Sequence, residues 1–128
     1  MSVSPEVLAW ITRAEEDYIL AGVALRRKKP LTYGTCFHAQ QCAEKYLKAV
    51  LVEKGQAFPK THDLVALSNL CTHTGWSVSA SDDQLDALSA YAVQVRYPGV
   101  ELTPTEARQA LGIAKIIRRD VRKVLGLR

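Results

Sequence analysis

The sequence has little cysteine and no long apolar run, and both absences exclude classes of protein. Its three cysteines, Cys36, Cys42 and Cys71, are an odd number without a C-x-x-C pair. Neither a disulfide framework nor a zinc ribbon is therefore expected. The longest uncharged stretch, residues 64–81, contains Ser, Asn, Thr, His and Gly and is too polar for a membrane span. The N-terminal residues reach an acid by Glu6 without an apolar core, so we expect no signal peptide and a soluble cytoplasmic protein with reduced thiols.

Internal repeats, low-complexity tracts and long linkers are also absent from the sequence. A chain of 128 residues, 48% hydrophobic and 23% charged, has the size and composition of one globular domain, so we assign residues 1–128 to a single fold. No segment alternates apolar and polar residues for long enough to predict a sheet.

What the sequence does contain is a repeated spacing of apolar residues by three and four positions, which predicts helices. Stop and start signals divide the chain into five. The first helix follows Ser4-Pro5 and ends before Pro30, the second spans about Thr32–Lys54, the third begins after Thr61 and is closed by Gly75, the fourth opens at Ser81 and is broken at Pro98-Gly99, and the fifth opens at Thr103. We therefore predict an all-α fold, an up-and-down antiparallel helical bundle of four to five helices.

Positive charge is concentrated near the C-terminus. The net charge is +4, yet residues 107–128 hold seven basic residues and one acidic residue. Four of the basic residues share one helix face at positions i, i+7, i+11 and i+14: Arg108, Lys115, Arg119 and Arg122. They are candidates for nucleic-acid contact, and a solvated helix face is the alternative interpretation.

A second polar pattern lies on the second predicted helix. His38, Gln41, Lys45 and Lys48 fall within an arc of about 80°. An imidazole, an amide and two ammonium groups can donate hydrogen bonds to phosphate or to a base. The arc could thus line an anion or nucleotide pocket, although the spacing alone favours a solvated helix face. No cluster of residues has metal-site spacing, because His38 and Cys42 lack further ligands, so we expect no metal and no cofactor.

Three segments resemble landmarks of HEPN domains, of the nucleotidyltransferase-associated type. Residues 37–51, FHAQQCAEKYLKAVL, resemble the family's signature helix, and residues 59–64, PKTHDL, resemble the segment that follows it. Tyr91 with residues 96–99, RYPG, is similar to the third landmark. The resemblance covers nearly the whole chain and implies an up-and-down helical bundle.

The resemblance also implies functions. HEPN domains are associated with nucleotide or RNA binding, and many are encoded beside a minimal nucleotidyltransferase in toxin–antitoxin pairs. Many are metal-independent ribonucleases that act as dimers, and their nuclease motif is an Arg and a His with four to six residues between them. Arg96 matches that arginine, but Glu101, Leu102 and Thr103 occupy the positions where the histidine is expected. The usual ribonuclease motif is thus incomplete.

We therefore carry three hypotheses. The first is a module that binds nucleotide or RNA, works with a nucleotidyltransferase partner and forms a homodimer, with Trp10 at the margin of the core face as a candidate partner contact. The second is an endoribonuclease that uses Arg96 with a relocated base such as His38. The third is a purely structural oligomerisation bundle.

For the first two hypotheses we predict one cleft between the second helix and the end of the fourth. There Arg96 and Lys45 would hold phosphate, Tyr97 would stack on a base, and His38 and Gln41 would complete the lining. His62 is expected to support the start of the third helix by hydrogen bonding.

Overall fold

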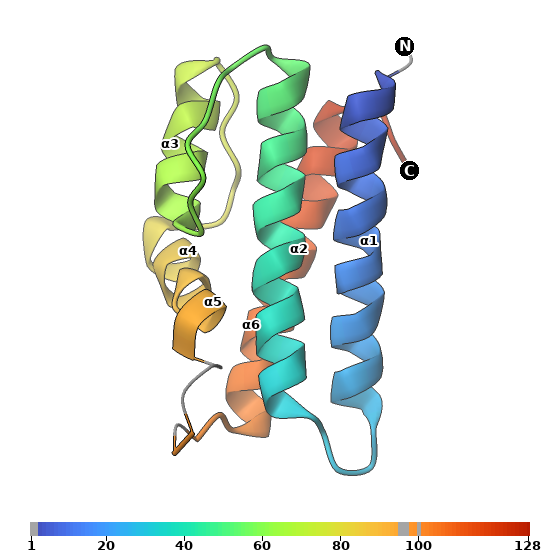
Figure 1. Cartoon of the computed structure of the whole chain (residues 1–128), viewed down its shortest axis with the longest axis vertical. Helices are drawn as coiled ribbons and strands as arrows, with labels where there is room; N and C mark the ends of the chain where they lie inside the picture. The colour runs from blue at the N-terminus through green and yellow to red at the C-terminus, as the bar shows by residue number, and fades with distance from the viewer. Residues whose placement is uncertain (1–2, 95–97, 100) are drawn as a thin grey trace.

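The computed structural model of the chain describes residues 3–94, 98–99 and 101–128, and in these ranges it contains helices and no strand. Three long helices run side by side, α1 (Pro5–Arg26), α2 (Thr32–Glu53) and α6 (Pro104–Val124). Three shorter helices, α3 (Leu64–His73), α4 (Asp82–Ser89) and α5 (Tyr91–Gln94), stack along the side of α2 opposite α1 (Figure 1). Helix α2 packs against each of the other five helices and is the centre of the bundle. The predicted all-α bundle is confirmed.

The ends of the helices follow the signals in the sequence. Ser4 caps α1 by accepting a hydrogen bond from the Val7 amide at 3.2 Å, with Pro5 at the first helical position. Ser81 with Gln84 and Thr103 with Glu106 form capping boxes at the starts of α4 and α6, the two helix starts predicted at these residues. Each box satisfies backbone amides that a helix start leaves without an intrahelical partner.

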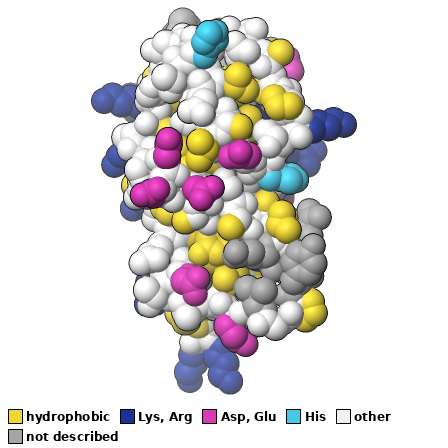
Figure 2. Space-filling view, turned by 90° about the vertical axis from the view of Figure 1, so that its left-hand side faces the viewer, with side chains coloured by type: hydrophobic (Ala, Val, Ile, Leu, Met, Phe, Trp, Pro, Cys, Tyr) yellow, Lys and Arg dark blue, Asp and Glu magenta, His cyan; other side chains and the backbone are white. Residues whose placement is uncertain are grey.

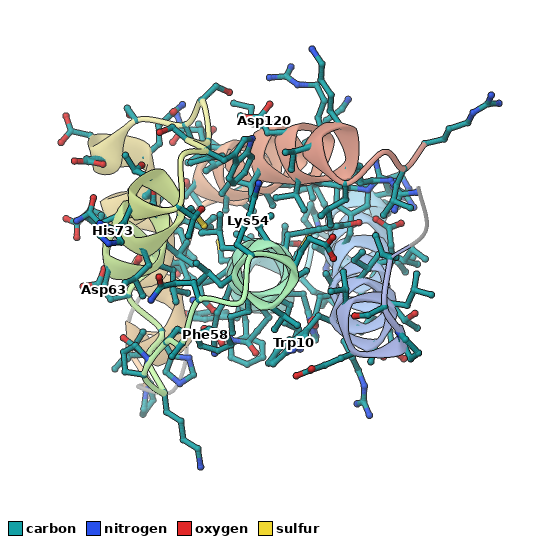
Figure 3. All side chains as sticks on the ribbon, turned by 90° about the horizontal axis from the view of Figure 1, so that it is seen from above. Trp10, Lys54, Phe58, Asp63, His73 and Asp120 are labelled. Atoms are coloured by element: carbon teal, nitrogen blue, oxygen red, sulfur yellow. The ribbon has the colours of Figure 1, made fainter. Side chains whose placement is uncertain are left out.

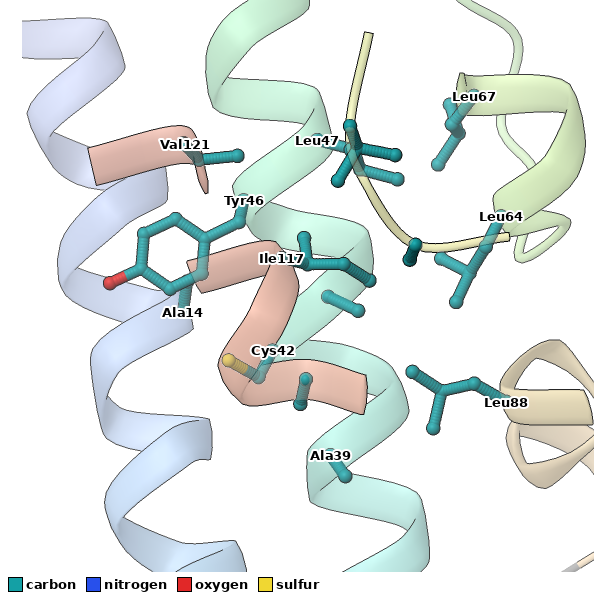
Figure 4. Close-up of a cluster of buried hydrophobic side chains, with 14 of the residues drawn as sticks. Ala14, Ala39, Cys42, Tyr46, Leu47, Leu64, Leu67, Leu88, Ile117 and Val121 are labelled. Atoms are coloured by element: carbon teal, nitrogen blue, oxygen red, sulfur yellow. The ribbon is translucent and has the colours of Figure 1, made fainter. Parts of the chain in front are cut away.

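The core lies where the helices meet on α2 (Figure 4). Tyr46 and Leu47 of α2 and Ile117 of α6 have no exposed surface. Ala14 is a small residue on the α1 side of this core, while leucines close the opposite side: Leu64, Leu67 and Leu88. Small side chains thus face the large ring of Tyr46, and large ones fill the space toward α3 and α4, as interdigitated packing requires.

One predicted helix differs in the structure. The fourth predicted helix is divided at Ala90 into α4 and α5. The Ser89 hydroxyl donates to the Leu85 carbonyl at 2.8 Å and accepts from the Leu64 amide at 2.9 Å, so it ties the end of α4 to the start of α3. Helix α3 begins at Leu64, after Thr61 as predicted, and Asp63 caps it.

Charge is segregated on the surface. Figure 2 shows acidic side chains across the face that α3 and α4 form, with lysines and arginines at its edges. Asp82, Asp83 and Asp86 of α4 are exposed. This face is unsuited to a polyanion. Among the described residues, no helix has both the length and the apolar character that crossing a bilayer requires.

Candidate ligand site between α1 and α2

The polar arc of α2 lies at the seams between α2 and its neighbours. His38, Gln41 and Lys45 are half-buried and Lys48 is buried, so the arc is not a freely solvated face. Figure 3 looks along the helices and shows that Trp10 and Phe58, which flank Lys48, lie on the side of α2 away from α6. The arc therefore faces α1 on one side and the linker between α2 and α3 on the other.

Asp17 of α1 joins two of the predicted site residues. Its side chain is buried, with 6% of the residue exposed, and it lies opposite α2. One carboxylate oxygen is 2.8 Å from Nδ1 of His38, and the other accepts from Nζ of Lys45 at 2.5 Å. The carboxylate fixes the orientation of both side chains. When Nδ1 of a histidine is held by a carboxylate, Nε2 is the ring nitrogen that can bind a ligand or transfer a proton.

Glu44 of α2 organises the other side of the arc. Its carboxylate lies 2.7 Å from Nδ1 of His62, and it accepts from Lys48 at 3.0 Å and from Gln40 at 3.1 Å. Burial opposes ionisation of Glu44, but these three hydrogen bonds outweigh it and lower the pKa of the carboxyl below its ordinary value. Gln41 extends the network by donating to the Gln40 side chain at 2.7 Å.

His62 has a different role from the predicted one. The cap of α3 is Asp63, whose Oδ1 accepts from the amides of Val65 and Ala66. His62 instead turns to Glu44, and its backbone carbonyl accepts from Gln40 at 3.2 Å. The expectation that His62 supports the helix start is therefore wrong, since it fastens the linker to α2.

Lys48 is buried between two aromatic rings. Its ammonium lies 5.6 Å from the ring centroid of Trp10 and 5.7 Å from that of Phe58, and the two rings meet edge to face at 6.3 Å. Both contacts are in the range of a cation–π interaction. Together they hold the indole of Trp10 at the seam between α1 and α2.

A pocket opens beside this indole. It has a volume of about 350 Å³ and is lined by Glu6, Ala9, Trp10 and Arg13 of α1 and by Lys45 of α2. An aromatic ring, a guanidinium, an ammonium and a carboxylate thus converge on one cavity. We call it the Trp10 pocket. It contains one of the predicted ligand-binding residues, Lys45, while Gln41 lies one turn earlier on α2.

The predicted basic stripe of α6 does not form one uniform surface. Arg108, Lys115 and Arg119 are exposed. Arg122 is only half-exposed: it donates to the Tyr46 hydroxyl at 3.3 Å and to the carbonyl of Arg128. Three residues of the stripe are thus open to a polyanion, and the fourth is engaged within the protein.

Arg122 belongs to an internal network centred on Glu15 of α1. Arg118 donates to Glu15 at 2.5 and 3.2 Å, and the Tyr46 hydroxyl donates to the same carboxylate. Burial opposes ionisation of Glu15, but the bonds from Arg118 and Tyr46 prevail and lower its pKa. Burial, followed by the bond to Glu15, raises the pKa of Tyr46. This network joins α1, α2 and α6 and serves the fold.

The three cysteines are free and buried. Burial raises the pKa of Cys36 and of Cys71 to about 12 and raises that of Cys42 as well. None of these thiols forms a thiolate at neutral pH, so none is a candidate nucleophile.

Two predicted site residues, Arg96 and Tyr97, lie outside the described residues. Sequence reasoning missed Asp17, Glu44, Trp10 as a pocket wall, and Arg13. Asp17 was the detectable one, because it lies one turn from both Ala14 and Ala21, which the apolar spacing assigns to the inner side of the first helix. A carboxylate in that position signals a buried partner.

Comparison with known proteins identifies the family. The HEPN domain model matches residues 7–124. No curated protein matches the chain at a significant level. The crystal structure of TT1696 from Thermus thermophilus superposes with a TM-score of 0.71 at 25% identity, covering 94% of this chain and 98% of that one. ST0689, an archaeal HEPN homologue, gives a TM-score of 0.67 at 25% identity, covering 93% and 97% of the two chains. The chain belongs to the HEPN domain family.

Proposed function

We propose that this HEPN domain binds a nucleotide or a short single-stranded RNA segment in the Trp10 pocket. The observation that carries the proposal is the convergence of Trp10, Arg13 and Lys45 on one cavity of about 350 Å³. The family membership, which is generally associated with nucleotides and RNA, supports it.

Each lining residue suits one part of such a ligand. An indole provides a flat surface on which a base stacks, and stacking contributes about 1–3 kcal/mol per base. Arg13 can hold a phosphate through two parallel hydrogen bonds, and Lys45 adds a point charge. Because Asp17 already fixes Lys45, little side-chain entropy is lost when the ligand binds.

Tryptophan fluorescence tests the proposal directly. The chain has two tryptophans, so a Trp76→Phe background leaves Trp10 as the reporter. We expect AMP and an oligoadenylate to quench Trp10, and Arg13→Gln to weaken binding about tenfold, the loss of one charge-assisted hydrogen bond. Lys54→Gln removes an exposed charge elsewhere and is the matched control. Equal affinities of the two variants would contradict the proposal.

A second candidate is a metal-independent ribonuclease, and the Asp17–His38 pair favours it. A carboxylate on Nδ1 orients the imidazole, as general acid–base catalysis needs. In this step the ribose 2′-oxygen would attack the adjacent phosphorus while His38 takes the 2′-hydroxyl proton. The P–O5′ bond breaks, and the products are a 2′,3′-cyclic phosphate and a 5′-hydroxyl that takes its proton from solvent water. We expect His38→Ala to abolish RNA cleavage with binding retained, and Arg96→Ala to weaken both. A wild-type protein that binds RNA without cutting it would exclude this candidate.

We further propose that the domain works in the cytoplasm with a minimal nucleotidyltransferase as a toxin–antitoxin-like pair. The resemblance of the signature helix to nucleotidyltransferase-associated members supports this. Co-expression with the product of the neighbouring reading frame tests it: the two proteins should purify together, and the partner should relieve any growth arrest that this chain causes alone. Independent behaviour in both assays would favour the purely structural bundle.

A further inference from the structure

The Trp10 pocket has two chemically different ends. Its α1 residues Glu6, Trp10 and Arg13 stand at positions i, i+4 and i+7 and fall within an arc of about 60°, so they follow one another along one side of the helix. Glu6 lies one turn before the indole, and Arg13 lies almost one turn after it. Along the helix axis, the indole thus stands between a carboxylate and a guanidinium.

The ammonium of Lys45 belongs to the Arg13 end of the pocket. It donates to Asp17 at 2.5 Å, and Asp17 lies one turn after Arg13 on α1. Asp17 is separated from Glu6 by about 16 Å along the helix axis. Arg13 and Lys45 therefore lie on the same side of Trp10, and that side is the place for a phosphate group.

The carboxylate at the other end is available to a ligand. Glu6 is exposed, and no ion pair or side-chain hydrogen bond between residues that the structure describes involves it. Asp17, by contrast, is shared by His38 and Lys45. The first turn of α1 also favours the negative charge of Glu6, because the amide dipoles of a helix place partial positive charge there. The pocket thus offers a ligand one carboxylate acceptor as well as two cations.

We propose that the Trp10 pocket selects guanine, with the base stacked on Trp10, its Watson–Crick edge on Glu6 and its 5′-phosphate on Arg13 and Lys45. This proposal rests on the proposed function, because it names the base that the same pocket prefers. In a nucleotide the sugar connects the base to the phosphate. A phosphate at the cation end therefore leaves the far edge of the base facing the carboxylate end.

Guanine suits a carboxylate better than the other common bases. Its Watson–Crick edge presents two neighbouring donors, N1–H and the N2 amino group, and an ionised carboxylate has two acceptor oxygens and no donor. The two parallel hydrogen bonds are charge-assisted, as in a bidentate arginine–carboxylate pair. Adenine and cytosine place a ring-nitrogen acceptor beside the amino donor, and uracil has carbonyl oxygens on both sides of its one N–H group. These acceptors would face the carboxylate and be repelled by it.

Fluorescence titration in the Trp76→Phe background tests the choice of base. We expect GMP to bind about tenfold more tightly than AMP, which is the discrimination of one bidentate contact. IMP lacks the N2 amino group and should fall between them. Equal affinities of GMP and AMP would overturn the guanine proposal and leave the proposed function in place, whereas a protein that binds no nucleotide would overturn both.

Glu6→Gln tests the residue that makes the choice. An amide has one acceptor and one donor group, so it can pair with the mixed edge of adenine as well as with guanine. We expect this change to reduce the ratio of GMP affinity to AMP affinity about tenfold. Glu16→Gln makes the same charge change at an exposed position outside the pocket and should keep the ratio. A Glu6→Gln variant that keeps the ratio would overturn the proposal.

2′-Deoxy-GMP separates recognition of the base from recognition of the sugar. Ribose hydroxyls are also donors and can bind a carboxylate. We expect 2′-deoxy-GMP to bind as tightly as GMP, because Glu6 contacts the base. A loss as large as that of AMP would place Glu6 on the sugar and overturn the proposal.

A free nucleotide and single-stranded RNA offer the same guanine chemistry, and two pentanucleotides distinguish these sources. UUGUU and UUAUU differ only in the central base. A preference for UUGUU would support the proposal with RNA as the source, and a preference confined to the mononucleotides would support it with a free guanine nucleotide as the source. Tighter binding of UUAUU than of UUGUU would overturn it.

Discussion

Two buried carboxylates determine how the polar residues of α2 are arranged. Asp17 binds His38 and Lys45, and Glu44 binds Lys48 and His62. Each carboxylate converts flexible side chains into fixed ones. A fixed ammonium or imidazole at a pocket wall costs less entropy on binding than a free one. The residues that position the candidate site are thus acids, although its ligand is expected to be an anion.

Sequence reasoning found the basic members of these pairs and missed the acidic ones. His38 and Lys45 are detectable because their spacing puts them on one helix face. Asp17 comes from a different helix, and no local pattern states which residue of α2 it will face. Glu44 lies on α2 itself, but its burial depends on the linker that His62 holds in place.

The Glu44–Lys48 pair gives the first prediction. Both residues are buried, so Glu44→Gln would leave the Lys48 ammonium without its counter-ion. We expect this change to lower the free energy of unfolding by about 3 kcal/mol. Glu44→Gln combined with Lys48→Met should recover part of the loss, because no unpaired charge remains buried. Urea unfolding measures both, and a double variant less stable than the single one would contradict the argument.

The second prediction concerns acid. The pKa of Glu44 in the folded protein is lower than its ordinary value of about 4.3, so the folded state binds fewer protons than the unfolded state. The stability that this carboxylate contributes is complete above about pH 4.3 and is lost as the pH falls through the lower folded value. We therefore expect the stability difference between wild type and Glu44→Gln to be constant near neutral pH and to narrow below about pH 4.3. Urea unfolding at several pH values, with Glu53→Gln as an exposed control on the same helix, measures it.

At the scale of the elements, the helix starts were the most predictable features. Ser4, Ser81 and Thr103 each cap the helix that their sequence context predicts. The break between α4 and α5 was not predictable, because residues 82–94 contain neither Gly nor Pro. It accompanies the contact of Ser89 with the start of α3, which exists only in the folded bundle. Local sequence signals therefore predict helix ends that are stabilised by hydrogen bonds within a few residues. Helix ends that depend on tertiary contacts are not predicted in this way.

Helix α6 gives the third prediction, on polyanion contact. Its exposed residues Arg108, Lys115 and Arg119 remain candidates, whereas Arg122 is engaged by Tyr46 and is left unchanged. If all three contact phosphates, changing them to Gln should reduce the slope of log K against log salt by up to about three. Fluorescence anisotropy of a labelled RNA at several salt concentrations measures the slope.

A matched variant separates position from total charge. Changing Lys28, Lys29 and Lys54 to Gln removes the same number of exposed charges at other places. If the α6 variant reduces the slope of log K against log salt more than this control does, the phosphate contact lies on α6. Equal effects would leave that face of α6 as solvated surface.

For the whole molecule, the central position of α2 is the property on which the rest depends. It contacts every other helix, and Tyr46, Leu47 and Val50 have no exposed surface. The bundle class follows from apolar spacing, but neither the division of the fourth predicted helix into α4 and α5 nor the choice of α2 as the centre does. The polar arc of α2 favoured one solvated side of this helix. That side is covered instead by Asp17 of α1 and by His62 of the linker between α2 and α3.

This central position gives the last prediction. Opening α2 exposes the interfaces of all the other helices at once, so its amides should exchange only when the whole domain unfolds. Helix α4 buries only Leu85 and Leu88 and is eight residues long, so it should open locally at a smaller cost. We expect hydrogen–deuterium exchange followed by mass spectrometry to show the slowest exchange in α2 and clearly faster exchange in α4. In Glu44→Gln, α2 should exchange faster in proportion to the loss of global stability, while α4 changes less. Equal protection of α4 and α2 in the wild-type protein would mean that the bundle opens as one unit and that α2 has no special place in its stability.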